Sequence, residues 1–345
     1  MEQGAYFALL REKMQKIMEK FVYMEETSGG NAQPPKIMGK CVYTGEEPEA
    51  KARLRHLFHN QTASVASLAP EFQDWNDWTV ECVENEDWAG LCRVINQRGK
   101  GDMMPCIYGS YTHEKNFHCA LECLVCGNVL AIERLLPPDL TKVKDGYMAL
   151  FPVAAHLMIG LWYKDQGVLE WAVPEAEALL GTKKLSGMEK AMIAFLLDLV
   201  SGDMEKGSQD LLAVCKSAGR DKRYVLGVRP FCTYAHGLYC LAQLLLPEEV
   251  FDTLEMPAYK NFLPAFAQWR RENPNPDRSL WIRYPEDLEI LNQIYTAPPA
   301  RLVLFQPLLD NPNVKPRERQ QWMSHGMKWV DNYVEELWSM GVGQG

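Results

Sequence analysis

The stretch that decides the fold is GMEKAMIAFLLDLVSGDMEKGSQDLLAVCKSAG, residues Gly187–Gly219. Its first half places apolar side chains three and four residues apart, on one face of an α-helix. These side chains are Met188, Ala191, Met192, Phe195, Leu196 and Leu199. Ser201-Gly202-Asp203 then interrupts the helix, because glycine suits a left-handed helix end and aspartate caps the next start. The second half carries its own face of Ser208, Leu211, Leu212 and Cys215. The pattern predicts two antiparallel helices joined by a tight turn.

Similar units flank this hairpin. Their helices are predicted at Phe117–Cys126 and Val129–Leu136, at Tyr147–Tyr163 and Val168–Leu180, and at Phe231–Leu246. The turns between paired helices, Gly127-Asn128 and Asp165-Gln166-Gly167, again contain glycine. Because no residue recurs at a fixed offset, the sequence is not a consensus repeat. We therefore predict an all-α fold, a degenerate stack of helical hairpins that is either a TPR-like α-solenoid or an irregular bundle.

The remainder of the chain has a less regular pattern. Further helices are predicted at Tyr6–Met24, at Glu49–Ser67 and from Pro316 onward, where Trp322, Gly326, Trp329, Val330, Tyr333 and Leu337 share one face. Loops are predicted at residues 27–48 and Gln97–Pro105, extended segments at Ile37–Tyr43 and Arg301–Phe305, and a frayed tail at Gly341–Gly345. Residues 1–105 form an N-terminal helical region, and residues 106–345 form a hairpin region that ends in a long C-terminal helix. We expect both regions to belong to one continuous domain.

Composition indicates a globular protein of the cytoplasm. The chain has 345 residues, of which 47% are hydrophobic and 23% charged, so it can bury a core without disulfides or metals. No apolar run approaches the length of a membrane span, and charged residues interrupt Met1–Phe21, where a signal peptide would be apolar. The ten cysteines are scattered in apolar helical segments, which predicts free thiols in a reducing compartment.

The net charge of −9 bears on the choice of partner. Binding to nucleic acid needs basic patches, so this charge argues against a direct nucleic-acid partner. A membrane partner is not expected either. The charge permits a basic protein partner, although acidity in a cytoplasmic protein more often reflects solubility alone.

The sequence contains no local constellation that predicts catalysis, a cofactor or a metal. The patterns GxxxxGK[ST] and GxSxG are absent. His113-Glu114 with His118 resembles a zinc helix, but the two histidines are five residues apart and fall on different faces. Cys119, Cys123 and Cys126 share a helical face, yet the outer two lie about 10 Å apart along the axis, too far for one zinc ion. The remaining histidines have no visible partner in the sequence for metal binding or catalysis. Each is more simply a core or surface side chain with its hydrogen bonds satisfied: His56, His59, His156, His236 and His325.

One segment combines aromatic and acidic residues in a way that suits protein recognition. It contains Trp75, Trp78, Glu81, Glu84, Glu86, Asp87 and Trp88. Tryptophan in a charged rim is common where proteins bind one another, so this segment is the candidate partner-binding surface. The same spacing also fits the inner and outer faces of an ordinary helix, with the tryptophans in the core.

The passage Phe195–Asp203, FLLDLVSGD, within Ala191–Leu212, resembles the central region of bacterial immunity proteins of the Imm49-like kind. The following helix, with Ala235, Gly237, Leu238, Ala242 and Leu245, is similar to a later small-residue helix of that family. The resemblance extends from Tyr108 to Phe266 and carries no functional residues over. It implies a helical-hairpin protein that binds and occludes a cognate secreted toxin, for which an acidic surface would suit a basic nuclease.

Two other functions are compatible with the same sequence. A helical-repeat scaffold or adaptor would have the same pattern, and a toxin gene next to this gene would distinguish immunity from scaffolding. An all-α enzyme with residues assembled from distant segments is the third interpretation. A deep polar pocket with converging carboxylates would support it.

Overall fold

A computed structural model describes residues 3–19, 21–23, 41–43, 45, 47–59, 72–103, 108–109, 112–142, 150–220, 230–306, 308–320, 322 and 324–344. Well over half of these residues are helical, which confirms the all-α prediction. None of the helices in the described ranges is both long and apolar enough to cross a membrane.

The α-helices are α1 (Gln3–Met18), α2 (Glu49–His59), α4 (Phe72–Glu84), α5 (Trp88–Met103), α6 (Thr112–Val125), α7 (Ile132–Leu135), α8 (Leu150–Tyr163), α9 (Gln166–Leu180), α10 (Gly187–Ser201), α11 (Met204–Ala218), α12 (Thr233–Leu245), α13 (Glu248–Phe251), α14 (Pro264–Glu272), α15 (Glu289–Thr296), α16 (Pro316–Arg319) and α17 (Gly326–Ser339). Single 3₁₀ turns are η2 (Val129–Ala131) and η4 (Glu286–Leu288). The described strands are very short. Strands β1 (Phe21–Tyr23) and β2 (Cys41–Tyr43) pair in parallel, and β3 (Tyr108–Gly109) and β4 (Ser324–His325) pair antiparallel.

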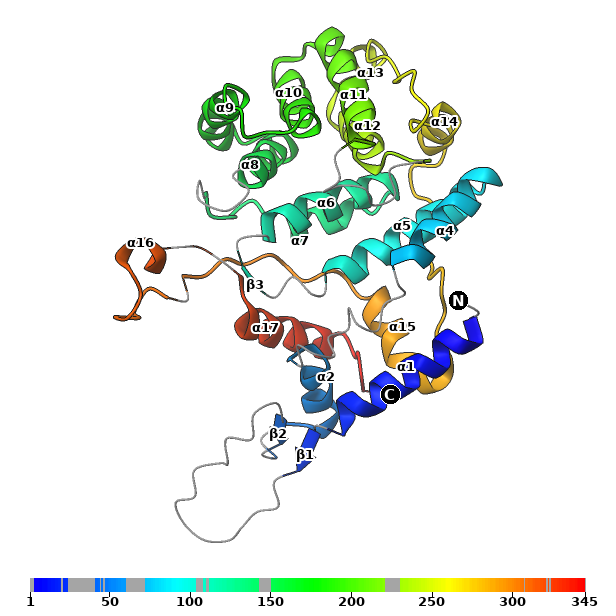
Figure 1. Ribbon diagram of the computed structural model, residues 1–345, viewed down its shortest axis with the longest axis vertical. Coiled ribbons are helices and arrows are strands. Elements are labelled where there is room, and N and C mark those ends of the chain that lie inside the picture. The colour runs from blue at the N-terminus through cyan, green and yellow to red at the C-terminus, as the bar shows by residue number, and fades with distance from the viewer. Residues whose placement is uncertain are drawn as a thin grey trace.

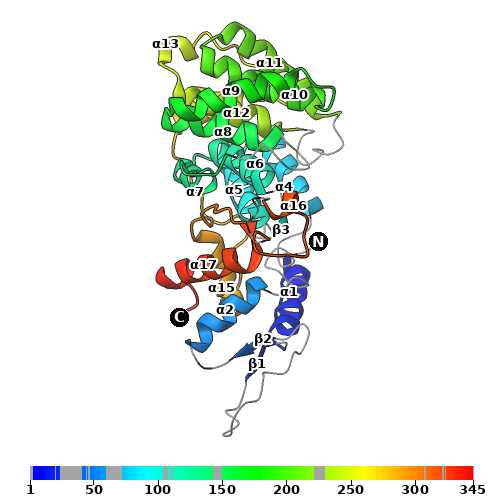
Figure 2. The same ribbon diagram turned by 90° about the vertical axis from the view of Figure 1, so that its left-hand side faces the viewer.

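The predicted hairpins form a stack at one end of an elongated molecule (Figures 1 and 2). Helix α8 pairs with α9 and α10 pairs with α11, and α10 also packs against α8. Helix α6 lies below them and contacts α5, α8 and α12, so it is covered on several sides. Helices α1, α2, α15 and α17 make up the opposite end.

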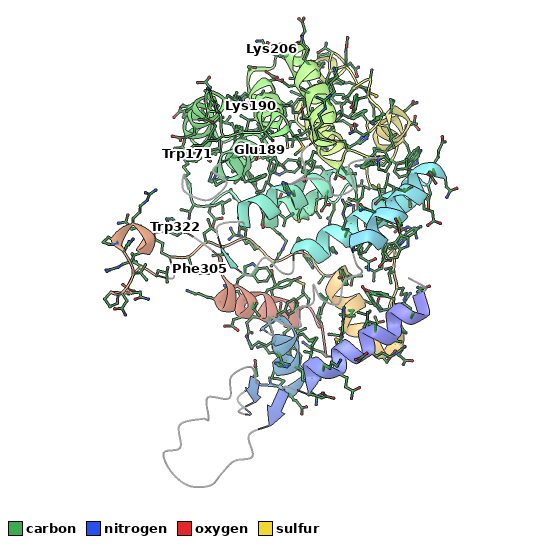
Figure 3. All side chains as sticks on the ribbon, in the orientation of Figure 1. Trp171, Glu189, Lys190, Lys206, Phe305 and Trp322 are labelled. Carbon is green, nitrogen blue, oxygen red and sulfur yellow. The ribbon has the colours of Figure 1, made fainter. Side chains whose placement is uncertain are left out.

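The α10–α11 hairpin has the end signals that its sequence predicts. Ser186 and Glu189 form a capping box, in which the Ser186 Oγ accepts from the Glu189 N–H (3.3 Å) and the Glu189 carboxylate accepts from the Ser186 N–H (2.6 Å). Gly202 ends α10 with φ +76°, a conformation that glycine adopts without strain. Asp203 then caps α11 by accepting from the Lys206 N–H (3.2 Å), and Lys206 marks the outer edge of the stack in Figure 3.

A close approach of two helices explains one glycine in the middle of α12. A Cβ at Gly237 would lie 2.8 Å from both the Cβ and the carbonyl oxygen of Leu121 in α6. Only glycine therefore lets α6 and α12 pack at this distance, and the contact seals α6 into the stack.

Buried side chains form two clusters. The hairpin core draws on α6 to α12 and includes Phe117, Phe151, Phe195, Leu211 and Leu238. The terminal core joins segments from both ends of the chain and includes Leu10, Phe58, Leu91, Tyr295 and Leu337. The terminal core therefore contains residues from both sides of the predicted boundary at residue 105.

Near the N-terminus, the predicted helix Tyr6–Met24 is too long. Helix α1 ends at Met18, and Phe21–Tyr23 turn into strand β1, whose aromatic and β-branched side chains favour extended backbone. Its partner β2 confirms part of the extended segment predicted at Ile37–Tyr43. The rest of that segment, most of the loop at 27–48 and the end of the helix predicted at Glu49–Ser67 lie outside the described residues.

Helix α5 continues to Met103, so the prediction of a loop at Gln97–Pro105 is wrong as far as the segment is described. Its polar residues suggested exposure, yet Gln97, Arg98 and Lys100 are buried. Gln97 bonds to the Ile282 backbone (2.8 and 3.1 Å), and Arg98 bonds to the Glu122 carboxylate (2.6 Å). Lys100 donates to the carbonyls of Tyr295 and Ala297 (2.6 and 3.1 Å). Partners on distant segments thus satisfy polar groups that would otherwise oppose burial.

The C-terminal segment also departs from the sequence pattern. The helix predicted from Pro316 is only the single turn α16, and α17 begins at Gly326, so Trp322 precedes it and packs against the hairpin core (Figure 3). The predicted strand at Arg301–Phe305 is wrong, since the segment contains only an isolated bridge at Phe305 and the Leu302 N–H bonds to the end of α7 at Arg134 (2.8 Å).

The tail does not fray in its described part. Val342 is buried, and the Gly343 N–H donates to the Gln293 side chain of α15 (2.8 Å). Glycines at positions 341 and 343 have φ of +86° and +79°, which lets the backbone turn back onto the terminal core.

Candidate functional site

The predicted partner surface lies where α4 ends and α5 begins. Glu86 occupies the turn with φ +53°, an uncommon conformation for a residue with a side chain. The Asp87 carboxylate accepts from the Gly90 N–H (2.8 Å), so Asp87 caps α5. The backbone and this cap together fix the geometry of the turn.

The three tryptophans of this segment face inward. Trp75 is only 4% exposed and meets the half-buried Trp78 edge to face, with ring centroids 5.1 Å apart. Trp88 is also half-buried and packs edge to face on Phe266 (5.9 Å). Trp75, Trp78 and Trp88 therefore join the terminal core, as in the alternative that the sequence left open.

The acidic side chains of the segment face outward. Glu81, Glu84, Glu86 and Asp87 are all exposed, and we call these four residues the acidic ridge. Within the described part of the chain, none of them forms an ion pair. The segment is therefore divided into buried rings that hold the turn and four carboxylates that a partner can reach.

The two hairpin turns that could serve as further contact sites differ in exposure. Gly202 is exposed, and a Cβ placed there would meet nothing within 4 Å. Gly127 is buried, and a Cβ there would lie 2.7 Å from the Pro274 carbonyl oxygen. Only the Gly202-Asp203 turn is thus open to a partner.

A groove of about 490 Å³ lies between α17 and residues 300–303. It is lined by Ala300, Arg301, Val303, Trp329, Asn332, Tyr333, Glu335 and Glu336. Its two carboxylates already have cationic partners. Glu335 pairs with Lys51 (2.6 Å) and Arg55 (3.1 Å), and Glu336 pairs with Arg134.

These ion pairs limit what the groove can do chemically. The hydrogen bond from Lys51 holds the pKa of Glu335 below its usual value, so this carboxyl is ionised at neutral pH and has no proton to donate. Glu335 is therefore unsuited to the role of a general acid in this groove.

The cysteines in α6 and directly after it behave as core side chains. Cys119, Cys123 and Cys126 are buried, and the Cys126 thiol donates to the Glu122 carbonyl (2.8 Å). Burial raises the pKa of Cys126 to about 12, which keeps the sulfur protonated. No three His, Cys, Asp or Glu side chains in the described segments are arranged to hold a metal ion.

The described histidines are also part of the core. His118 contacts Phe151 and Tyr234, and burial lowers its pKa to about 3. Two others bond to the backbone: His56 to the Ile17 carbonyl (2.7 Å) and His156 to the Pro152 carbonyl (2.7 Å). His236 stacks between Phe231 and Phe262, with centroids 4.3 and 4.1 Å away. The side chains of His59, His113, Glu114 and His325 lie outside the described residues.

Two pairs of interacting side chains have almost no signal in the sequence. Asp198 interacts with Asp210 across the α10–α11 hairpin, and Cys215 near the end of α11 interacts with Cys232 at the start of α12. Each pair joins residues 12 or more positions apart, and only the three-dimensional packing brings them together. The spacing of Asp198 and Asp210 around the turn at Gly202 is the one feature that could have suggested a contact.

Comparison of the chain with protein-family models, with curated proteins and with solved structures found no match.

Proposed function

We propose that this chain is an immunity protein, which binds a cognate toxin of a competing bacterium and blocks it by occlusion. The observation that supports this function is the acidic ridge. It consists of exposed carboxylates on a turn whose position is fixed by the buried Trp75 and the half-buried Trp88. A fixed array of like charges suits the recognition of a basic protein surface.

A basic partner follows from the charge of the ridge and of the whole chain. A toxin that acts on an anionic substrate such as nucleic acid has a basic active-site face, and an acidic protein can cover that face. Complementary charge raises association rates by roughly 10- to 1,000-fold at low salt, which favours capture before the toxin acts. Such an immunity protein works in the cytoplasm, where its toxin acts.

A growth experiment tests the proposed function. The toxic domain encoded beside this gene is expressed in a susceptible bacterium, with and without this chain. Restored growth, together with a stable complex of the two purified proteins, supports immunity. Continued killing in the presence of soluble chain, or a neighbouring gene whose product is harmless, contradicts it.

A charge-reversal variant tests the surface. Glu81, Glu84 and Glu86 are replaced together by Lys, and Asp87 is kept because it caps α5. The matched control replaces the exposed Glu205, Glu249 and Glu255 by Lys, which changes the net charge equally. Association with the toxin is then measured over a range of salt concentrations.

The two variants separate a local effect of the ridge from an effect of overall charge. We expect the ridge variant to associate about 10-fold or more slowly at low salt, with a flatter salt dependence, while the control stays close to the unmodified protein. Equal slowing in both variants would show that only net charge matters. No change in the ridge variant would move the contact to the exposed Gly202-Asp203 turn.

A further inference from the structure

The groove beside α17 has two walls that come from different parts of the chain. Along α17, Trp329, Tyr333 and Glu336 are spaced four and three residues apart, so they share one face of the helix. Across from them Arg301 lines the groove, while the neighbouring Leu302 is buried and its N–H bonds to the end of α7. In Figures 1 and 2 the chain that follows α15 passes directly above α17. The groove therefore lies between a helix face and a segment that the fold holds in place.

Half of the lining is apolar or aromatic, and it consists of Ala300, Val303, Trp329 and Tyr333. The rings of Trp329 and Tyr333 contact each other, with centroids 5.5 Å apart. The Tyr333 hydroxyl already donates to the Pro298 carbonyl (3.0 Å), so it is satisfied within the protein. A concave and partly apolar site of this volume suits a small molecule, since such sites span about 300–1,000 Å³.

One wall carries a guanidinium that has donors to spare. The Arg301 side chain is 43% exposed and pairs with the Asp139 carboxylate through Nη2. Among the described residues, Asp139 is the only hydrogen-bond or ion-pair partner of this side chain, whereas a guanidinium has five N–H donors. Asp139 is itself 68% exposed, so the pair is a weak surface contact. Arg301 can therefore receive a carboxylate from a ligand, in the two-pronged geometry that arginine favours.

The other wall carries carboxylates. Glu336 lies on the same face of α17 as Trp329, and its Oε2 pairs with Arg134. Arg134 also donates to the Pro299 carbonyl, which holds this pair beside the groove. A carboxylate can accept about four hydrogen bonds, so Glu336 keeps acceptor sites for a ligand. Glu335, one residue earlier, adds a second negative charge, and this wall therefore suits an ammonium group.

We propose that the groove is a binding site for a short apolar peptide with both ends free, of the dipeptide class. The peptide carboxylate pairs with Arg301, its ammonium pairs with Glu336, and its side chains cover Val303 and Trp329. The charges favour this ligand because the two walls carry opposite signs, so an ion of a single sign meets a like charge on one wall. The site does not include the acidic ridge, and it goes beyond the proposed function, which does not depend on it.

The position of the charges on opposite walls favours a dipeptide over a single amino acid. In an amino acid both charged groups are bonded to one carbon atom, whereas each further residue of an extended peptide separates them by about 3.5 Å. The exposed Asn332 also lines the groove from α17. Its side-chain amide can donate to and accept from the peptide group between the two residues of the ligand.

Calorimetric titration of the full chain with a matched series of probes tests the proposal. The probes are the dipeptide alanyl-phenylalanine, its N-acetyl form, which lacks the ammonium, and its C-terminal amide, which lacks the carboxylate. Free phenylalanine is the single-residue probe. We expect the dipeptide to bind with a dissociation constant of about 1 mM or lower, and each other probe to bind about 5-fold or more weakly, because each loses one ion pair.

Substitutions assign each charge of the ligand to its residue. Arg301→Gln should weaken the dipeptide about 5-fold or more but leave the amide unchanged, and Glu336→Gln should weaken the dipeptide but leave the N-acetyl form unchanged. Val303→Phe, which fills the groove, should block all probes. The controls Arg283→Gln and Glu249→Gln change exposed residues outside the groove and should bind every probe like the unmodified protein.

No heat of binding with about 10 mM dipeptide, equal binding of the capped forms or of phenylalanine, or unchanged binding in Arg301→Gln would overturn the proposal. If Glu336→Gln leaves Arg134 unpaired and does not fold, as circular dichroism would show, the N-acetyl probe on the unmodified protein tests the ammonium contact instead. The titrations contain no toxin, so their failure and a failure of the immunity function are separate results.

Discussion

The stability of the α10–α11 hairpin should fall as the pH rises through neutrality, because Asp198 and Asp210 share a proton. Asp198 is 8% exposed, and among the described residues no N–H or hydroxyl group donates to its Oδ2. Two adjacent carboxylates repel one another when both are ionised, so a proton on one of them stabilises the pair. Burial and then the Asp210 carboxyl raise the pKa of Asp198 to about 7, and burial raises that of Asp210. Nearby Asp203 adds to this effect and Lys206 opposes it.

The direction and size of the effect follow from proton linkage. The folded protein holds a proton that an unfolded aspartate with pKa 3.8 releases, so unfolding releases a proton between pH 3.8 and about 7. This contribution is fully present below pH 3.8 and is lost by about pH 7. Within that window the free energy of unfolding falls by about 1.4 kcal/mol per pH unit. Because the window ends at about pH 7, the total decrease between pH 5.5 and 8 should be about 2 kcal/mol.

Urea unfolding at several pH values measures this slope in matched variants. In Asp198→Asn a neutral amide donates to Asp210 without a shared proton, so the decrease between pH 5.5 and 8 should disappear. The control is Asp203→Asn, which keeps a half-buried capping side chain and should retain most of the decrease, because Asp203 contributes less to the raised pKa of Asp198 than burial and Asp210 do. A variant Asp198→Asn with the same slope as the unmodified protein would refute the shared proton.

Three further results are expected. Glu122→Ala should lower the free energy of unfolding by about 3–5 kcal/mol, measured in urea, because it removes the carboxylate that lies 2.6 Å from the buried Arg98 guanidinium. Gly237→Ala should lower it by about 1–3 kcal/mol through the clash with Leu121, whereas Gly219→Ala, whose Cβ meets nothing within 4 Å, should change it by less than about 1 kcal/mol. Thiol titration of freshly purified protein, unfolded without reductant, should count close to ten free thiols, and a markedly lower count would contradict the reducing compartment.

The difference between α10–α11 and α5 shows which parts of this fold are visible in the sequence. The hairpin was predictable because its apolar spacing, its glycine and its capping aspartate are all local. Helix α5 was not, because Gln97, Arg98 and Lys100 look like loop residues until their partners near residues 122, 282 and 295 are known. The periodicity of a sequence reports where apolar groups face, but it cannot report a polar group whose partner is far along the chain.

The same limit applies to the candidate surface. The acidic and aromatic composition of residues 75–88 was clear, but composition does not tell which side chains turn inward. The structure resolves this because Trp281 and Phe266, both far away in the sequence, provide the surfaces on which Trp78 and Trp88 pack. The proximity of Cys215 and Cys232 was hidden for a similar reason, since Asn261 from a third segment bonds to the backbones of both.

The inward position of the tryptophans changes what the acidic ridge can contribute to binding. A tryptophan that anchors a partner has to lose water on binding, but Trp75 has already lost it in the free protein. The ridge therefore offers charge without an apolar anchor, and charge at a rim acts mainly on the association rate. Truncating Trp88 would remove its contact with Phe266 and loosen the base of the ridge, so its first effect should be on stability and not on dissociation. A tight complex would then need its desolvated anchors on a neighbouring surface or on the partner itself, with the ridge serving to guide the encounter.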